Sequence, residues 1–199
     1  MKYPILGRER RRPIALSAVG TVLVLAFACV LFTLTVLAIQ PGLLPDTLAA
    51  FWEDKLLIPL NIFPVCVVLI VCYCLTGNAF SAAGIGGLIV NLLSYINLVK
   101  TDCRNDPFVP ADCALLREAA NAVGDYQLDL HWGPLAAILL LSAVCFALAY
   151  WSRARRPRWY VRGIMALVVL AVFGASMVKV YPSEDIYNRR GVGTVKVSK

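Results

Sequence analysis

The stretch AFSAAGIGGLIVNLLSYINLVKTDCRNDPFVPADC, residues 79–113, changes character in its middle. An apolar run without charges gives way at Lys100 to a segment of acids, arginine, cysteine and proline. The hydrocarbon core of a bilayer is roughly 30 Å thick, and a helix needs about 20 apolar residues to cross it. We therefore expect a membrane span over 79–99 and a polar segment outside the bilayer from residue 100 onward.

Further apolar runs flank this span on both sides. The chain has 199 residues, of which 60% are hydrophobic and only 16% are charged, a composition typical of membrane proteins. The expected spans are 14–39, 56–75, 79–99, 133–151 and 163–181. No segment predicts a strand. The sequence thus predicts an all-α polytopic membrane protein with one membrane domain, residues 1–181, and an external tail, residues 182–199.

Basic residues set the expected orientation. Residues 1–13 carry five basic side chains and one acid, and the linker 152–162 carries five arginines and no acid. Because short cytoplasmic segments are enriched in Lys and Arg, both should be cytoplasmic. The loop 100–132 and the tail are then outside. The net charge of +7 is explained by this orientation, so we expect the bilayer, and no nucleic acid, as the partner of the basic residues.

The third span carries small and polar residues at helical spacing. Its glycines would let neighbouring helices approach closely, and its side-chain amides could bond across to a partner helix. The polar residues are Asn91, Ser94 and Asn97. Spaced by three, they form a stripe that we expect to face the interior of the bundle. The stripe either holds helices together or lines a path for a lipid or an ion.

The external loop divides into two parts. Pro107 and Pro110 prevent a regular helix in the first part. In the second part Asp112 is a good N-cap, apolar residues recur at helical spacing, and Gly124 is placed to end a helix. We predict an amphipathic helix over 112–124, too short to cross the membrane and lying at its outer surface.

Several residues near this loop are candidates for contact with lipid headgroups. Arg104 follows Lys100 by four residues, at the level of the phospholipid phosphates, and arginine binds phosphate through two hydrogen bonds. Both residues could instead pair with Asp102, Asp106 or Asp112 to fix the loop. Cys103 and Cys113 could form a disulfide outside the membrane, whereas the other five cysteines fall within spans, where we expect small apolar side chains.

Evidence for catalysis or metal binding in the chain is weak. His131 is the only histidine, and its place beside Trp132 favours an anchor at the membrane surface. The loop's scattered carboxylates have neither a Cys/His pattern nor the spacing of a calcium loop. We therefore expect no catalytic residue and no metal ligand in this chain.

The loop pattern and the five spans together resemble a known family. The pattern consists of Asn97, Arg104, Pro107-Phe108 and Asp112, followed by a short helix ending near Tyr126. It resembles the membrane domain of the lipoteichoic acid synthase family, which are bacterial phosphoglycerol transferases of the alkaline phosphatase/sulfatase superfamily. The two loop cysteines are not part of the family pattern, which leaves their role open.

The resemblance implies a function in the bacterial plasma membrane. Family members transfer glycerol phosphate from phosphatidylglycerol with an extracellular domain that holds a threonine nucleophile and a divalent metal, commonly manganese. This chain contains no counterpart of that domain, so we expect it to anchor and position such a domain, present in cis or in trans. Residues 182–199 resemble the start of the linker towards it. The contact residues would be Asn97, Lys100, Arg104 and Asp112.

Two other functions fit the sequence. The chain could be a small stand-alone transporter of lipids or solutes that uses the polar stripe, or a structural subunit that recruits a separate enzyme of the cell envelope.

Overall fold

The fold is a bundle of long helices. The computed structural model describes residues 14–39, 43–53, 55–104, 131–154 and 157–179. The long helices are α1 (Ala18–Ile39), α3 (Leu57–Thr76), α4 (Ala79–Arg104), α6 (Trp132–Trp151) and α7 (Trp159–Lys179). All five are long and apolar enough to cross a membrane, which confirms the predicted helical class. The helix predicted over 112–124 lies outside the described residues.

The first span begins later than predicted. Residues Ile14–Leu16 form a short strand, β1, which pairs in parallel with β2 (Ser152–Ala154) after α6. Ser17 then caps α1, because its hydroxyl oxygen accepts a hydrogen bond from the backbone N–H of Gly20 at 3.1 Å. The sequence did not predict this short strand pair, since three-residue strands are too short to show a period.

Other boundaries also differ from the predicted spans. Helix α4 continues past residue 99 to Arg104, so the first charged residues of the loop extend the helix. A short helix that we did not predict, α2 (Leu43–Glu53), lies between the first two spans. Its Pro45 is tolerated in the first turn, where backbone N–H groups have no partner within the helix. The negative charge of Asp46, in the same turn, interacts favourably with the positive end of the helix dipole.

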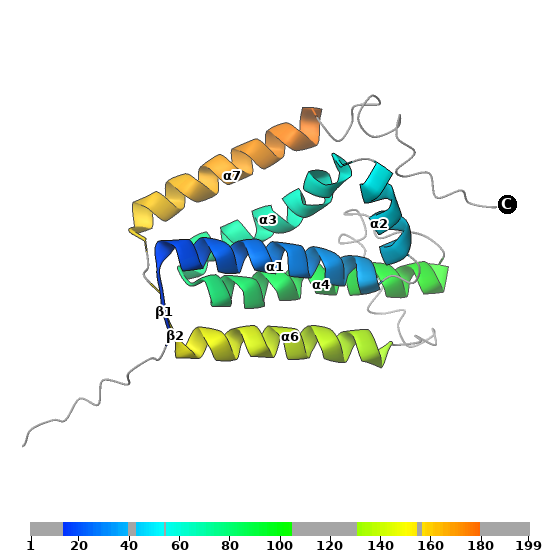
Figure 1. The fold of residues 1–199 in the computed structure, drawn as a ribbon, viewed down its shortest axis with the longest axis horizontal. Helices are drawn as coiled ribbons and strands as arrows, with labels where there is room; N and C mark the ends of the chain where they lie inside the picture. The colour runs from blue at the N-terminus through cyan, green and yellow to red at the C-terminus, as the bar shows by residue number, and fades with distance from the viewer. Residues whose placement is uncertain (1–13, 40–42, 54, 105–130, 155–156, 180–199) are drawn as a thin grey trace, which may run out of the picture.

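Helix α4 is the centre of the bundle. It packs against α1, α3 and α6, whereas α7 packs against α3, so that α6 and α7 lie at opposite edges (Figure 1). Three glycines of α4 each face a different neighbour. The closest side chains to these glycines are Phe146 of α6 at Gly84, Leu69 of α3 at Gly86 and Phe32 of α1 at Gly87. The small residues permit close helix packing, as the sequence predicted.

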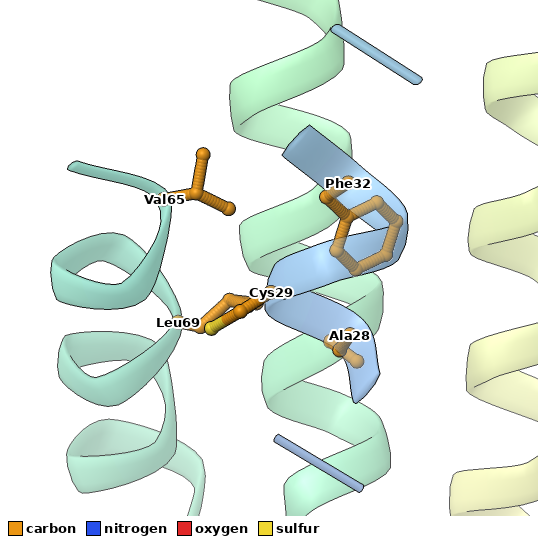
Figure 2. Close-up of a cluster of buried hydrophobic side chains, with 6 residues drawn as sticks. Ala28, Cys29, Phe32, Val65 and Leu69 are labelled. Atoms are coloured by element: carbon orange, nitrogen blue, oxygen red, sulfur yellow. The ribbon is translucent and has the colours of Figure 1, made fainter. Parts of the chain in front are cut away.

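The best-buried apolar cluster joins three helices around this centre. Figure 2 shows side chains of α1 and α3 turned toward one another beside α4. The cluster contains Ala28, Cys29, Phe32, Val65, Leu69 and Ala83. The five cysteines within the spans are free thiols. The sulfur atoms of two of them, Cys29 and Cys66, lie 3.3 Å apart. These cysteines serve as small packing side chains.

The bundle has two ends. The arginine end is the one where α6 finishes and α7 begins, beside the arginine-rich segment 152–162, and the loop end is the one where α4 finishes and α6 begins. At the arginine end, α3 turns into α4 through Gly77, whose φ of 67° is a left-handed conformation that favours glycine. The connection between α3 and α4 is therefore a tight turn. The strands and the start of α7 lie at the same end, on the left of Figure 1.

Candidate functional site

The candidate contact residues begin on the last turns of α4. Asn97 and Lys100 are partly buried there, and the Asn97 carbonyl accepts a hydrogen bond from the Thr101 hydroxyl at 2.8 Å. Arg104 is the last residue of the helix, one turn beyond Lys100. Since residues four apart share one face of a helix, the backbone places Lys100 and Arg104 on the same side of α4. Asp112 lies outside the described residues.

A hydrogen bond closes the loop end of the bundle. His131 Nε2 lies 2.7 Å from Asp102 Oδ2, which links the end of α4 to the residue before α6. The side chains are 45% and 46% exposed, so water reaches both. Sequence reasoning considered each residue but did not predict the pair. The available signal was that both residues flank neighbouring spans on the same side of the membrane.

The polar stripe of α4 is used in packing against α1. Asn91 is only 2% exposed; its side-chain oxygen accepts from the Thr35 hydroxyl at 2.7 Å, and its amide donates to the Gly87 carbonyl at 2.8 Å. Ser94 donates to the Val36 carbonyl at 3.1 Å. These bonds support the first of the two interpretations of the stripe, in which it holds helices together.

A small cavity opens beside this stripe. It has a volume of about 220 Å³ and lies between α1, α4 and α6, toward the loop end. Its lining consists of Thr35, Ala38, Ile39, Asn91, Pro134, Ala137, Ile138 and Leu141. Because Thr35 and Asn91 already bond to each other, the walls are largely apolar and suit an alkyl chain better than a polar solute.

The described part of the chain contains no group of three or more His, Cys, Asp or Glu side chains that could hold a metal ion. Among these residues, no further Asp, Glu or Cys side chain lies close enough to His131 and Asp102 to complete a metal site with them. Cys103 lies in the last turn of α4, whereas Cys113 lies outside the described residues, so their disulfide stays a prediction. The pair of His131 and Asp102 can fix the end of α4 and the start of α6 relative to each other.

Tryptophans mark both ends of the bundle. Trp52 and Trp132 are exposed at the loop end, and Trp151 and Trp159 are exposed at the arginine end. Such belts are typical of the two interfaces of a membrane. Together with five long apolar helices, they define the class of this chain, a helical membrane protein. No family model, no curated protein and no solved structure matches the sequence.

Proposed function

We propose that this chain anchors and positions the catalytic domain of a lipoteichoic acid synthase-like phosphoglycerol transferase in the bacterial plasma membrane. The N-terminus would be cytoplasmic and the C-terminus extracellular, which agrees with the five long apolar helices of the described residues and with arginines at the opposite end from His131. The catalytic domain, in cis or in trans, would supply the threonine nucleophile and the manganese.

The observation that carries this proposal is the bond between Asp102 and His131. Because it joins the end of α4 to the start of α6, the loop with the family-like pattern starts and finishes over one small area. Lys100 lies two residues before that bond, and Arg104 lies two residues after it. Cationic residues at these two positions would suit the phosphate of phosphatidylglycerol, the proposed lipid partner.

The transporter hypothesis has less support. The side chains of Asn91 and Ser94 are occupied by hydrogen bonds to α1 and within α4, so they do not offer free ligands to a passing solute. The cavity beside them is small and largely apolar. A structural subunit that recruits a separate enzyme would use the same loop end, and it differs from our proposal only in the enzyme recruited.

The experiment reconstitutes the full chain, joined to or mixed with a sulfatase-like extracellular domain, in vesicles that contain phosphatidylglycerol labelled in its headgroup. We expect Arg104→Ala and Asp112→Ala to lower glycerol-phosphate transfer about tenfold, the effect of losing one charge-assisted contact. Protein level should not change. The matched control is Lys55→Ala, which removes an exposed charge between α2 and α3 and should leave the rate unaltered.

Two results would contradict the proposal. If Arg104→Ala and Asp112→Ala leave both the rate and the protein level unchanged, the loop does not position the donor lipid. If the chain alone moves a labelled lipid or an ion across the vesicle membrane, the transporter hypothesis replaces ours. Co-purification with a different envelope enzyme would support the structural-subunit alternative.

A further inference from the structure

A second, larger cavity lies at the arginine end of the bundle. Its volume is about 600 Å³, and it opens between α1, α3 and α7. Its lining consists of Ala18, Thr21, Val22, Leu25, Ile70, Tyr73, Pro157, Arg158, Met165 and Val169. The walls are mostly apolar, and polar groups are few: Thr21, Tyr73 and one guanidinium, that of Arg158. The cavity is thus an apolar cleft with a positive charge in its lining.

A second arginine, Arg162, lies one turn beyond Arg158 and has incomplete hydrogen bonding. Arg162 is partly buried on the first turn of α7, and its Nη1 donates to the Leu75 carbonyl at 3.4 Å. Its Nε is buried and has no hydrogen-bond partner within the part of the chain that the structure describes. A buried N–H of a charged group is costly when it is unpaired. Arg162 therefore has the capacity to bind an anion.

The segment that leads into α7 is one-sided in charge. Residues 152–162 contain five arginines and no acid, and Arg158 Nη1 donates to a neutral group, the Tyr160 hydroxyl at 2.9 Å. The interfacial side chains Trp159 and Tyr160 place this segment at the level of lipid headgroups. An anion bound here would therefore come from the membrane surface.

Helix α7 leaves one wall of the cleft accessible from the bilayer. It has no buried residue, in contrast to α1, α3 and α6. It packs against α3 and lies at the edge of the bundle (Figure 1). An apolar chain between α1 and α7 would contact Leu25 and Val169 and cover the surface of these two side chains. The shape and the lining suit an acyl chain.

We propose that this cleft binds an anionic glycerophospholipid of the adjacent leaflet. One acyl chain would fill the space between α1, α3 and α7, and the phosphate would accept hydrogen bonds from Arg158 and Arg162. The apolar lining argues against a free phosphate metabolite, and the one-sided charge argues against a zwitterionic lipid. The site lies at the opposite end of the bundle from Lys100 and His131, so it is independent of the function proposed above.

Native mass spectrometry of the full chain in detergent tests this site, because it counts bound lipids and copies of the chain together. The probe is an equal mixture of phosphatidylglycerol and phosphatidylcholine with the same acyl chains. We expect preferential retention of phosphatidylglycerol, reduced about tenfold in Arg158→Gln/Arg162→Gln. The control Lys55→Gln/Lys179→Gln removes the same charge elsewhere and should not change retention.

A second variant tests the acyl-chain half of the site without a change in charge. Met165→Trp should fill the cleft and lower retention of phosphatidylglycerol about as much as the arginine variant does. Excess glycerol 3-phosphate should not displace the lipid. The proposal is overturned by equal binding of both lipids, by unchanged retention in either variant, by displacement with glycerol 3-phosphate, or by a dimer that Met165→Trp abolishes.

Discussion

The ring of Phe32 occupies the space that a side chain on Gly87 would need. A Cβ atom added to Gly87 would lie far inside van der Waals contact with Cζ of Phe32. Phe32 is 1% exposed and belongs to the central apolar cluster (Figure 2), so its ring cannot move aside without disturbing α3 and α4. The close approach of α1 and α4 therefore depends on a glycine at this position.

We predict that Gly87→Ala destabilises the bundle by about 1–3 kcal/mol, the usual cost of overpacking a well-packed core. Thermal unfolding in detergent would measure the loss. Gly174→Ala is the matched control, because among the described residues no other helix lies within 4 Å of the added methyl group there. Adding Phe32→Leu to Gly87→Ala should recover part of the loss. Equal stability of Gly87→Ala and Gly174→Ala would contradict the packing argument.

Helix packing of this kind could be predicted from the sequence because its signal is local. The glycines and the residues Asn91 and Ser94 repeat at helical spacing within one span, and the structure turns both polar side chains toward α1. Asp102 and His131 are separated by a long loop, so their pairing depends on how α4 and α6 pack. No period within either segment contains that information.

The strands show a second reason why sequence reasoning fell short. Ile14–Leu16 begins a long apolar run, so the sequence suggests that it belongs to the helix that follows. In the structure, the helix starts only after its cap at Ser17. Its pairing with Ser152–Ala154 requires that both segments reach the arginine end of the bundle side by side. Tertiary placement, rather than local preference, therefore determines these strands.

The hydrogen bond between Thr35 and Asn91 should stabilise the contact between α1 and α4 only modestly. The Thr35 hydroxyl lies 2.7 Å from Asn91 Oδ1 but also 3.0 Å from the Phe32 carbonyl, so the two acceptors compete for one proton. We expect a double-mutant cycle of Thr35→Val and Asn91→Leu to give a coupling energy of about 0.6 kcal/mol, within the range found between membrane helices.

The control for this cycle is Ser176, whose hydroxyl donates to the Val172 carbonyl of its own helix, α7. Ser176→Ala should show no coupling with Asn91→Leu, because the two side chains share no partner. A coupling energy near zero for Thr35 and Asn91 would mean that the Thr35 proton remains with the Phe32 carbonyl.

The pair of Asp102 and His131 should act locally rather than on the whole bundle. Both side chains are nearly half exposed, and exposed pairs contribute only about 0.2–1 kcal/mol. We predict that Asp102→Ala leaves the unfolding temperature almost unchanged but speeds backbone amide exchange at the start of α6, where the Leu135 N–H donates to the His131 carbonyl. Hydrogen exchange read by mass spectrometry would detect the change.

The same experiment needs a charge control at this end of the molecule. Asp46 is an exposed carboxylate on α2, and Asp46→Ala should leave amide exchange at the start of α6 as it is in the unaltered chain. Exchange that stays slow in Asp102→Ala would show that the pair does not hold α6.

Asn78 should contribute more than these pairs, because one buried side chain makes bonds in two directions. Its Oδ1 accepts from the Phe80 N–H at 3.0 Å and so caps α4, while its Nδ2 donates to the Ser152 hydroxyl at 3.1 Å and lies 3.5 Å from the Ala149 carbonyl. The side chain therefore joins the α3–α4 turn to the end of α6.

We predict a loss of about 2 kcal/mol for Asn78→Ala, the sum of a helix cap and one buried hydrogen bond. Asn78→Asp separates the two contributions. Aspartate keeps the cap but cannot donate, and its charge would face the Ala149 carbonyl at the negative end of α6. It should therefore lose at least as much stability as Ser152→Ala, which we expect to cost about 1 kcal/mol.

Unfolding of these variants in detergent, beside Thr101→Ala as the control, decides between the two roles of Asn78. Thr101 is exposed and its hydroxyl bonds within α4, to the Asn97 carbonyl, so its removal should cost little. If Asn78→Asp proves as stable as the unaltered chain, the bonds to α6 contribute nothing and Asn78 acts as a cap alone. If Asn78→Asp is instead less stable than Asn78→Ala, the repulsion at the end of α6 costs more free energy than the cap contributes.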